Sequence, residues 1–391
     1  MYTATQKQGG APHSHHFHFL HSFLSKVVAF IKHNAVLCVA LLAAVVTSCI
    51  VLPDKEYLGY FDLKTLTCLF CVLAVVCALR NISFFTVLAR KIVLLFKNTR
   101  ASILALVYIT FLGSMLIAND MALLTFLPLG YFVLSSAGKK KYMAFTFIMQ
   151  NIAANLGGML TPFGNPQNLY LYTKFNIPTG AFVATMLPPF CISIALITLC
   201  CLFVKKEKLE LSDSPITLPK TKTVIYGLLF TLSIVIVFRV IPYYIGLIVI
   251  PLALLFMDRK ALAQVDYGLL LTFAAFFVFS GNMARIPAVR DLFEGLMDKQ
   301  PLLVSTLSCQ VISNVPSAIL LSQFTSAYAP LLVGVNIGGV GTLISSLASL
   351  ITFREYTKHN PHSAGKYLLL FSAFNFAFLA ILTVVEYLLF L

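Results

Sequence analysis

Charged residues are scarce in this chain. Asp, Glu, Lys and Arg make up only 11% of the 391 residues, whereas 59% are hydrophobic and the mean hydropathy is +0.90. Because a soluble globular domain carries about 25% charged residues, this shortage excludes a soluble enzyme or binding domain. Several apolar runs approach or exceed the roughly 18 to 20 residues that a helix needs to cross hydrocarbon. The sequence therefore predicts an all-α polytopic membrane protein.

Paired catalytic groups are missing from the apolar runs. An intramembrane hydrolase needs two acids, a Ser/His pair or a zinc-binding His pair at one depth. The apolar runs hold no mid-depth His and a single mid-depth acid, Asp120. The nine cysteines are scattered and are typical of small buried hydrophobic residues, not of a disulfide framework. We therefore expect neither an enzyme nor a cofactor, sodium ions aside.

Acids are scarcer than bases, at 14 against 28, and the net charge is +14. In a membrane protein such an excess marks cytoplasmic loops rather than a nucleic-acid partner. Bases gather in 80–100, 139–141 and the linker 204–221, whereas the acids of 54–62 fall on the opposite side. The first 34 residues show no cleavable signal peptide. We expect a plasma (inner) membrane protein with a cytoplasmic His-rich tail over 1–32 and the C-terminus outside.

The apolar runs divide the chain into two halves. Repeat 1 is predicted over 33–203 and repeat 2 over 222–391, joined by the cytoplasmic linker 204–221. Each half is predicted to contain a hairpin and a broken helix, at 101–137 and 142–174 in repeat 1 and at 300–327 and 328–352 in repeat 2. The other predicted spans are 33–52, 62–79, 180–203, 222–241, 243–257, 266–284 and 367–391. Whether 101–137 is a re-entrant hairpin or two full spans stays open.

One seven-residue pattern, N-φ-G-G-x-x-T, occurs once in each half. It covers Asn155–Thr161 and Asn336–Thr342, both inside long apolar stretches. Gly-Gly followed by polar residues predicts a helix that stops part-way across the bilayer, where its freed backbone must be satisfied by protein, water or a solute. Two such breaks in matching places of two halves are the sequence sign of a transporter's central site. Close helix packing is the alternative explanation of the Gly-Gly pairs.

A weaker echo supports the duplication. An apolar run that opens at Asp62 ends at Arg80, and another that opens at Asp266 ends at Arg285. The loop charges place the two repeats in opposite orientations, so the sequence predicts inverted repeats whose hairpins enter from opposite faces.

Polar clusters interrupt the apolar pattern at the hairpin tips and after the Gly-Gly pairs. Each cluster offers amide, hydroxyl or backbone groups, and none contains Lys or Arg. The candidate substrate- and ion-binding residues are Asn119, Asp120, Gly157, Gly158, Thr161, Pro162, Gly164, Asn165, Ser313, Asn314, Val315, Pro316, Gly339, Thr342, Ser345 and Ser346.

The ends of half-helices near these clusters would allow them to bind ions. A half-helix that begins near the midplane points free N–H groups and a positive dipole end at an anion. Carbonyls at the end of the preceding half-helix, helped by Asn and Ser side chains, can coordinate a cation. We predict sodium sites at Asn119, Asp120 and Gly158 and at Asn314 and Gly339.

Asp120 has two possible roles. A carboxylate at that depth is costly and indicates function, as a sodium ligand or a proton carrier. The alternative is a cap of the second half-helix at its N-terminus, and the two roles can coincide.

At these motifs the chain resembles the ion transporter superfamily, which includes citrate-transporter-like permeases, arsenical-pump membrane proteins, sodium/proton antiporters and divalent anion:sodium symporters. The resemblance rests on residues 118–128, 155–168, 266–267 and 313–316 and extends over roughly 35–391. The dicarboxylate symporters carry Ser-Asn-Thr at both tips, whereas this chain has Ala-Asn-Asp and Ser-Asn-Val, and the Asn-Asp form is closer to the arsenite and antiporter branches. The resemblance implies a homodimer with a fixed scaffold and a moving transport part.

The sequence thus favours a secondary transporter that moves a small anion, a carboxylate or an inorganic oxyanion, by alternating access coupled to sodium or protons. A sodium/proton antiporter or an arsenite-type permease using Asp120 is the alternative. The expected partners are the anionic solute, sodium or protons, the lipid bilayer and a second copy of the chain.

Overall fold

The computed structural model describes residues 34–209 and 217–390, so the predicted tail lies outside the described part. Its first half contains the helices α2 (Ala35–Ile50), η1 (Lys55–Tyr60), α3 (Leu63–Asn81), α4 (Phe84–Leu94), α5 (Thr99–Ile117), α6 (Asn119–Ser136), η2 (Lys140–Tyr142), α7 (Met143–Gly157), η3 (Gly158–Leu160), α8 (Pro166–Lys174) and α9 (Thr179–Leu202), where η marks a short 3-10 helix.

The second half is also helical. Its elements are α10 (Lys220–Val237), α11 (Tyr243–Met257), α12 (Arg259–Ala263), α13 (Tyr267–Arg285), α14 (Pro287–Lys299), α15 (Pro301–Ile312), α16 (Asn314–Leu321), α17 (Tyr328–Ile337), α18 (Leu347–His359), η4 (Pro361–Ser363) and α19 (Ala364–Phe390). The described residues contain no β-strand beyond an isolated bridge between Asn98 and Lys208.

Within the described residues, six helical segments are long and apolar enough to cross a membrane. They are Leu63–Asn81, Thr99–Ile117, Thr179–Leu202, Lys220–Val237, Tyr267–Arg285 and Pro361–Phe390. In hydrocarbon a backbone must satisfy its own hydrogen bonds, and a helix does so within one segment. The predicted fold class, an all-α polytopic membrane protein, is confirmed.

Acidic caps begin two of the long spans at equivalent places. The Asp62 Oδ1 accepts a hydrogen bond from the Thr65 amide at 3.0 Å at the start of α3. The Asp266 Oδ1 accepts one from the Leu269 amide at 2.8 Å at the start of α13. Each carboxylate satisfies a free N–H group and sits at the positive end of its helix. The acids that open the two apolar runs are therefore helix caps.

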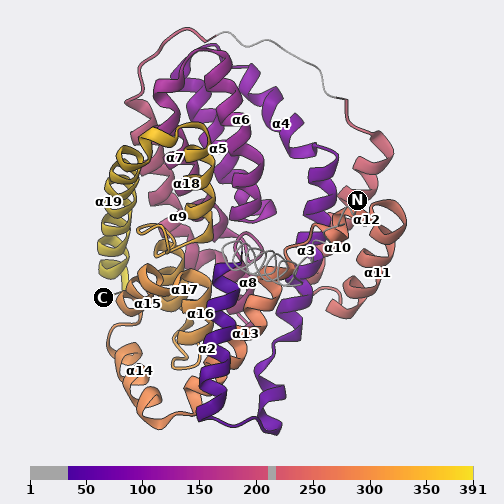
Figure 1. The fold of residues 1–391 in the computed structure, drawn as a ribbon, viewed down its shortest axis with the longest axis vertical. Coiled ribbons are helices and arrows are strands. Elements are labelled where there is room, and N and C mark those ends of the chain that lie inside the picture. Colours follow the sequence, from indigo (N-terminus) through magenta and orange to yellow (C-terminus); the bar gives the residue numbers. More distant parts are fainter. Residues whose placement is uncertain (1–33, 210–216, 391) are drawn as a thin grey trace, which may run out of the picture.

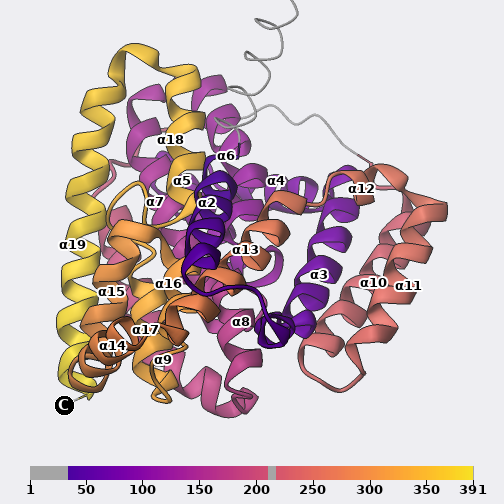
Figure 2. The same cartoon turned by 60° about the horizontal axis from the view of Figure 1, so that its bottom comes forward.

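Helices of one half pack on helices of the other. α2 packs along α13 while α11 packs along α3, and α6 packs on α18 while α16 packs on α8. α3, α10, α11 and α12 form one side of the molecule, and α19 lies on the opposite side (Figures 1 and 2). This exchange brings the hairpins of both halves into one central group.

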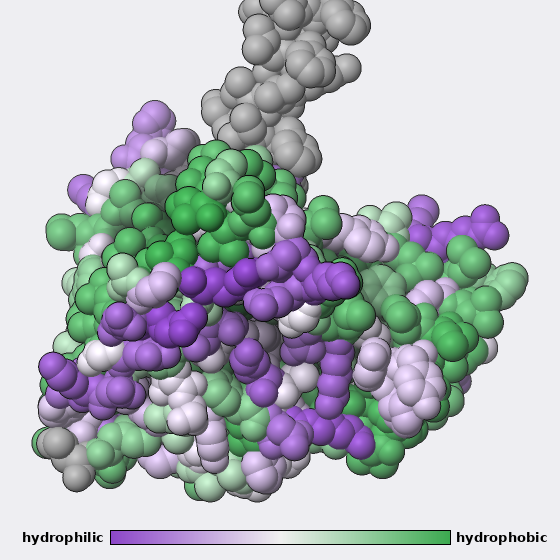
Figure 3. All heavy atoms as spheres, turned by 90° about the horizontal axis from the view of Figure 1, so that it is seen from below, coloured by the Kyte–Doolittle hydropathy of each residue, from purple (hydrophilic) through white to green (hydrophobic). Residues whose placement is uncertain are grey.

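The two hairpins enter the bundle from opposite ends. α4 and the outer ends of α5 and α6 lie toward the upper end of the molecule in Figure 1, whereas α14 lies at the lower end. Figure 3, which views the lower end, shows hydrophilic residues across the middle of this face and hydrophobic residues around much of its margin. The inverted-repeat relation and the domain limits stay predictions.

Candidate functional site

The two hairpin tips have the same local structure. Ala118 between α5 and α6 has φ 65° and ψ 153°, and Ser313 between α15 and α16 has φ 73° and ψ 161°. Both are non-glycine residues with positive φ, a conformation that persists only where the surroundings hold it. The next residue is Asn in each tip, and its side-chain Oδ1 accepts the following backbone N–H at 2.9 Å. α6 and α16 therefore begin with the same asparagine turn.

The two helix breaks also correspond. α7 ends at Gly157, and α8 begins after Asn165; α17 ends at Ile337, and α18 begins after Ser346. Asn165 and Ser346 both have extended backbone. The first break is so tight that a Cβ added to Gly164 would lie 2.2 Å from the carbonyl oxygen of Gly158. The glycine there is required by close backbone approach.

A threonine ties each break to the hairpin of its own half. The Thr161 hydroxyl donates to the carbonyl oxygen of Met115 at 2.7 Å, and the Thr342 hydroxyl donates to that of Gln310 at 3.1 Å. Met115 and Gln310 each lie four residues before the tip asparagine. The threonine that ends the N-φ-G-G-x-x-T pattern thus makes the same hydrogen bond to the hairpin in both halves.

The two tips meet at the breaks. The Asn119 Nδ2 donates to the Asn155 Oδ1 at 3.2 Å. A Cβ added to Gly339 would lie 3.2 Å from the Asn314 Nδ2 and 3.6 Å from the same Asn155 Oδ1. The Asn314 backbone N–H donates to the Ser345 carbonyl oxygen at 3.0 Å. The hairpin tips of both halves therefore converge on one polar centre.

Buried amides link the two breaks directly. The Asn165 Nδ2 donates to the Asn336 Oδ1 at 3.2 Å, and the Asn336 Nδ2 donates to the Asn168 Oδ1 at 2.6 Å. The Asn168 Nδ2 in turn faces the carbonyl oxygens of Gly158, Met159 and Thr161 at 3.2–3.3 Å. Asn165, Asn168 and Asn336 are each no more than 1% exposed. Most buried amide groups in proteins are paired; here Asn165 and Asn336 donate across the two halves, while the Asn165 Oδ1 has no partner among the described residues.

Helix ends supply the electrostatics of this centre. α6 and α16 begin at the tips, and α8 and α18 begin at the breaks, so four positive dipole ends lie there without a basic side chain in the clusters. The carboxyl ends of α5, α7, α15 and α17 bring carbonyl oxygens to the same place. Such an arrangement can bind an anion and a cation side by side.

Asp120 occupies the first turn of α6. Its backbone N–H bonds the Asn119 side chain, and its Oδ1 atom is buried with no hydrogen-bond partner among the described residues. No side-chain capping bond is made at the start of α6. The carboxylate therefore gains from the helix dipole and retains the capacity to take a proton or a cation.

Asp120 aside, the candidate residues divide into three groups. Asn119, Gly158, Gly164, Asn165, Asn314, Gly339 and Ser345 lie in the contacts of the centre, with Gly157 beside it at the end of α7. Thr161, Thr342, Ser313 and Ser346 support it: the Ser313 hydroxyl donates to the Ser345 carbonyl at 3.2 Å, and Ser346 caps α18. Pro162, Val315 and Pro316 have apolar side chains, and Val315 adds its backbone N–H, which donates to the Asn314 Oδ1 at 2.9 Å.

Four of the central amides, Asn155, Asn168, Asn336 and Gln310, are not among the predicted site residues. Asn155 and Asn336 open the repeated pattern, and an amide inside an apolar run is itself a signal of a polar site. Gln310 lies outside the polar clusters of the sequence. Its Nε2 donates to the carbonyl oxygens of Gly338 and Val340 at 2.9 and 3.2 Å, and its Oε1 accepts the Thr342 amide at 2.9 Å. Gln310 thus pairs the free backbone groups of the second break, as Asn168 does in the first break.

Known proteins resemble the chain along most of its length. Residues 27–333 match the family described as Citrate transporter. The chain is 31% identical over 305 residues to the uncharacterized transporter MJ0456 of Methanocaldococcus jannaschii, covering 78% of this chain and 84% of that protein. It is 29% identical over 280 residues to the inner membrane protein YbiR of Escherichia coli, covering 69% and 74%.

A shorter match, 30% over 160 residues, is to the silicon efflux transporter LSI3 of Oryza sativa subsp. japonica and covers 40% of this chain and 32% of that protein. Because the family match covers most of the sequence, the chain belongs to the citrate transporter family. The predicted resemblance to citrate-transporter-like permeases is confirmed, and the chain is a multi-pass membrane transporter.

Proposed function

We propose that this member of the citrate transporter family is a secondary transporter that carries a small anion, a carboxylate or an inorganic oxyanion, by alternating access coupled to sodium or protons. The observation that carries the proposal is the meeting of the two hairpin tips, through Asn119, Asn155, Gly339 and Asn314, at two helix breaks. Four helix N-termini around this centre favour an anion.

A coupling cation fits the same centre. The carbonyl oxygen of Gly158 accepts the Asn168 side chain at 3.3 Å, and that of Gly339 accepts the Ser345 hydroxyl at 2.9 Å. A carbonyl oxygen has two lone pairs, so each can still coordinate a hard cation such as sodium. The proposed sodium ligands are therefore Asn119, Asp120 and Gly158 in one half and Asn314 and Gly339 in the other.

Transport by purified protein in liposomes tests the proposal. The panel holds citrate, succinate, phosphate, sulfate and arsenite, with silicic acid added because a relative is named for silicon efflux. Sodium and proton gradients are imposed separately. We expect uptake of at least one anion that depends on one gradient and is lost in Asn314→Ala, with empty liposomes as the control. Uptake of no anion under any gradient would overturn the proposal.

A second candidate, a sodium/proton antiporter, is favoured by one observation: the unpartnered, buried Oδ1 of Asp120. The second half has Val315 at the same tip position, so this carboxyl group has no counterpart. An internal pH dye in the same liposomes distinguishes the two. Sodium-driven proton movement in the absence of every anion, abolished by Asp120→Asn, would establish exchange instead of anion transport.

We place the protein in the plasma membrane as a homodimer, with the N-terminus inside and the C-terminus outside. The relative from Escherichia coli is named as an inner membrane protein. Mass photometry of the purified protein in lipid nanodiscs checks the oligomeric state, and a monomer peak alone would contradict it.

A further inference from the structure

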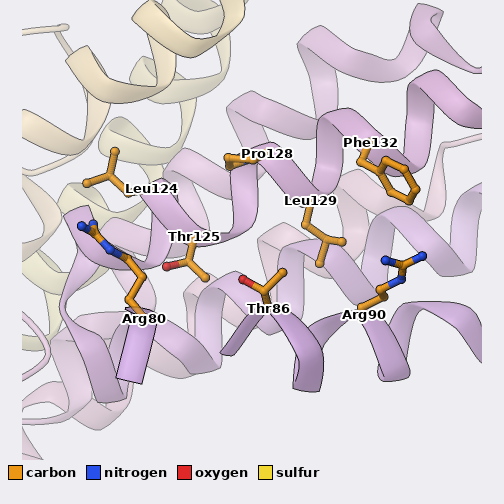
Figure 4. Close-up of a pocket in the computed structure, with 8 residues that line it drawn as sticks. All are labelled: Arg80, Thr86, Arg90, Leu124, Thr125, Pro128, Leu129 and Phe132. Carbon is orange, nitrogen blue, oxygen red and sulfur yellow. The ribbon is translucent and has the colours of Figure 1, made fainter. Parts of the chain in front are cut away.

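A cavity of about 290 Å³ lies away from the polar centre, along one side of α6. Its walls come from the end of α3, from α4 and from the α6 stretch that includes Thr125, Pro128 and Phe132 (Figure 4). α4 is the short amphipathic helix that follows α3, and it also packs on α5. The cavity thus opens beside the hairpin and not within it.

Two arginines occupy opposite ends of this cavity. Arg80 is close to the end of α3 and Arg90 belongs to α4, and Figure 4 shows them at the two ends of the lining, with Thr86 and Thr125 between them. The guanidinium of Arg90 lies 5.3 Å from the centre of the Phe132 ring, which fixes its direction. Both side chains are half-buried. The cavity therefore has a positively charged group at each end.

Arg80 is poorly neutralised by the described residues. Its Nη1 contacts the Met121 sulfur at 3.6 Å, a weak acceptor, and no carboxylate of the described ranges pairs with it. Arg285, which ends the corresponding run of the second half, differs. Its guanidinium holds both carboxylate oxygens of Asp54, at 2.6 and 3.0 Å. Arg80 thus lines a cavity, whereas Arg285, at the corresponding place in the second half, pairs with an acid.

We propose that the Arg80–Arg90 cavity is a second anion site, in which a carboxylate or phosphate group binds the guanidinium group of Arg80 and Arg90 adds positive charge at the other end. Guanidinium groups bind such oxyanions through paired, charge-assisted hydrogen bonds, and Thr86 adds a hydroxyl. A free solute and the phosphate of a lipid headgroup share this chemistry. Because Arg80 contacts Met121, one end of the cavity lies near the first turn of α6. The site does not depend on the transport proposal, since binding is measured without transport.

The absence of tryptophan from the chain provides a clean reporter. Phe132→Trp puts a single indole against Arg90 and preserves the cation–π contact. Phe256→Trp puts one on α11, where the native ring is 77% exposed and does not line the cavity. Each protein is placed in nanodiscs of zwitterionic lipid and titrated with phosphate or citrate. A second set of nanodiscs contains phosphatidylglycerol.

We expect saturable fluorescence changes at position 132 and not at position 256. Saturation by phosphate or citrate in zwitterionic nanodiscs identifies a free anion, whereas a change that requires phosphatidylglycerol identifies a lipid headgroup. In the Phe132→Trp background, Arg80→Gln should raise the apparent Kd roughly tenfold or more. Lys91→Gln removes the same charge from an exposed neighbour of Arg90 and should leave the Kd unchanged.

Two results overturn the proposal. One is no change at position 132 with either free anion or with phosphatidylglycerol. The other is a Kd that Arg80→Gln and Arg90→Gln leave as it was. If either glutamine variant does not fold, Arg80→Lys keeps the charge but loses the paired geometry, and it should still weaken binding several-fold. An unaltered Kd in a folded Arg80→Lys protein would count against the site.

Discussion

Amide side chains carry the hydrogen bonds at the centre of this bundle. Asn155, Asn165, Asn168 and Asn336 each bond across a helix break, and all are at most 2% exposed. An amide both donates and accepts, so it can satisfy broken backbone without the cost of a charge in hydrocarbon, which is at least about 2.5 kcal/mol. The hydrocarbon around the bundle therefore favours amides over charged side chains at the centre.

Asn336→Ala should destabilise the protein, because its Oδ1 and Nδ2 both serve buried partners. The substitution leaves Asn165 and Asn168 with unpaired groups, and each buried unpaired group costs about 1–3 kcal/mol. We expect a clear fall in the thermal midpoint in detergent. Asn81→Ala is the matched control, since Asn81 is exposed and bonds only Asp258. Equal midpoints for the two variants would show that the amide network adds little to stability.

Asp120→Asn tests the single carboxylate at the tip. Asn is as favourable as Asp at a helix N-terminus, so the variant should fold normally. If the carboxylate carries the coupling ion, gradient-driven uptake in liposomes should fall by roughly tenfold or more. Asp62→Asn is the control, because Asp62 caps α3 through the Thr65 amide. Unchanged uptake with unchanged sodium and pH dependence in Asp120→Asn would leave only a structural role.

At the scale of the element, each broken helix is held open by close backbone contacts. Gly164→Ala would place a Cβ 2.2 Å from the Gly158 carbonyl oxygen, so the backbone of the break must move. We expect lost transport and a lower thermal midpoint. Gly227→Ala in α10 is the control, because nothing lies within 4 Å of its added Cβ, and Ala there favours the helix by about 1 kcal/mol. A Gly164→Ala protein with normal transport would show that the break adapts.

The start of the linker is tied to the loop after the first hairpin. The Glu207 carboxylate accepts hydrogen bonds from Lys139, Lys141 and Tyr142 at 2.6–2.7 Å, and these donors lower its pKa from 4.5 to about 2. Because the folded-state pKa is the lower one, this tie stabilises the protein above pH 4.5 and is lost as the pH falls toward 2.

Comparing Glu207→Gln with the parent protein tests the tie. The thermal midpoints should differ most near neutral pH and converge as the pH is lowered below the ordinary pKa of the carboxyl group. Glu294→Gln, an exposed residue of α14, should show no such pH-dependent difference. A difference for Glu207→Gln that grows on acidification would contradict the assigned sign.

Elements were more predictable from the sequence than their partners were. Gly157 and Gly339 mark both breaks because Gly-Gly followed by polar residues stands out in an apolar run. Arg80 and Gln310 do not stand out, since a polar residue inside or at the end of a span has many possible partners. Only the folded chain shows that Gln310 reaches a break 28–32 residues further on. A helix break can therefore be predicted from neighbouring residues, whereas the side chain that contacts it from a distant segment cannot.

At the scale of the whole molecule, exchange between halves determines the architecture. α6 packs on α18 and α16 packs on α8, so neither hairpin is enclosed by its own half alone. A hydrophobic pattern reports which residues are buried but not which helix buries them, and so the exchange could not be predicted. Two hairpins that enter from opposite ends and meet at one centre are what alternating access between two faces needs.

Orientation in the membrane is the last prediction. Lys140, in η2 next to the Glu207 contacts, should face the cytoplasm, and Asp291, in α14, should face outside, because bases concentrate on the cytoplasmic side. After the nine native cysteines are replaced, single cysteines are placed at 140 and 291 and treated with a membrane-impermeant maleimide on intact cells. Position 291 should react at once and position 140 only after the cells are opened. The reverse order would invert the topology and would place the Arg80–Arg90 cavity on the outer side.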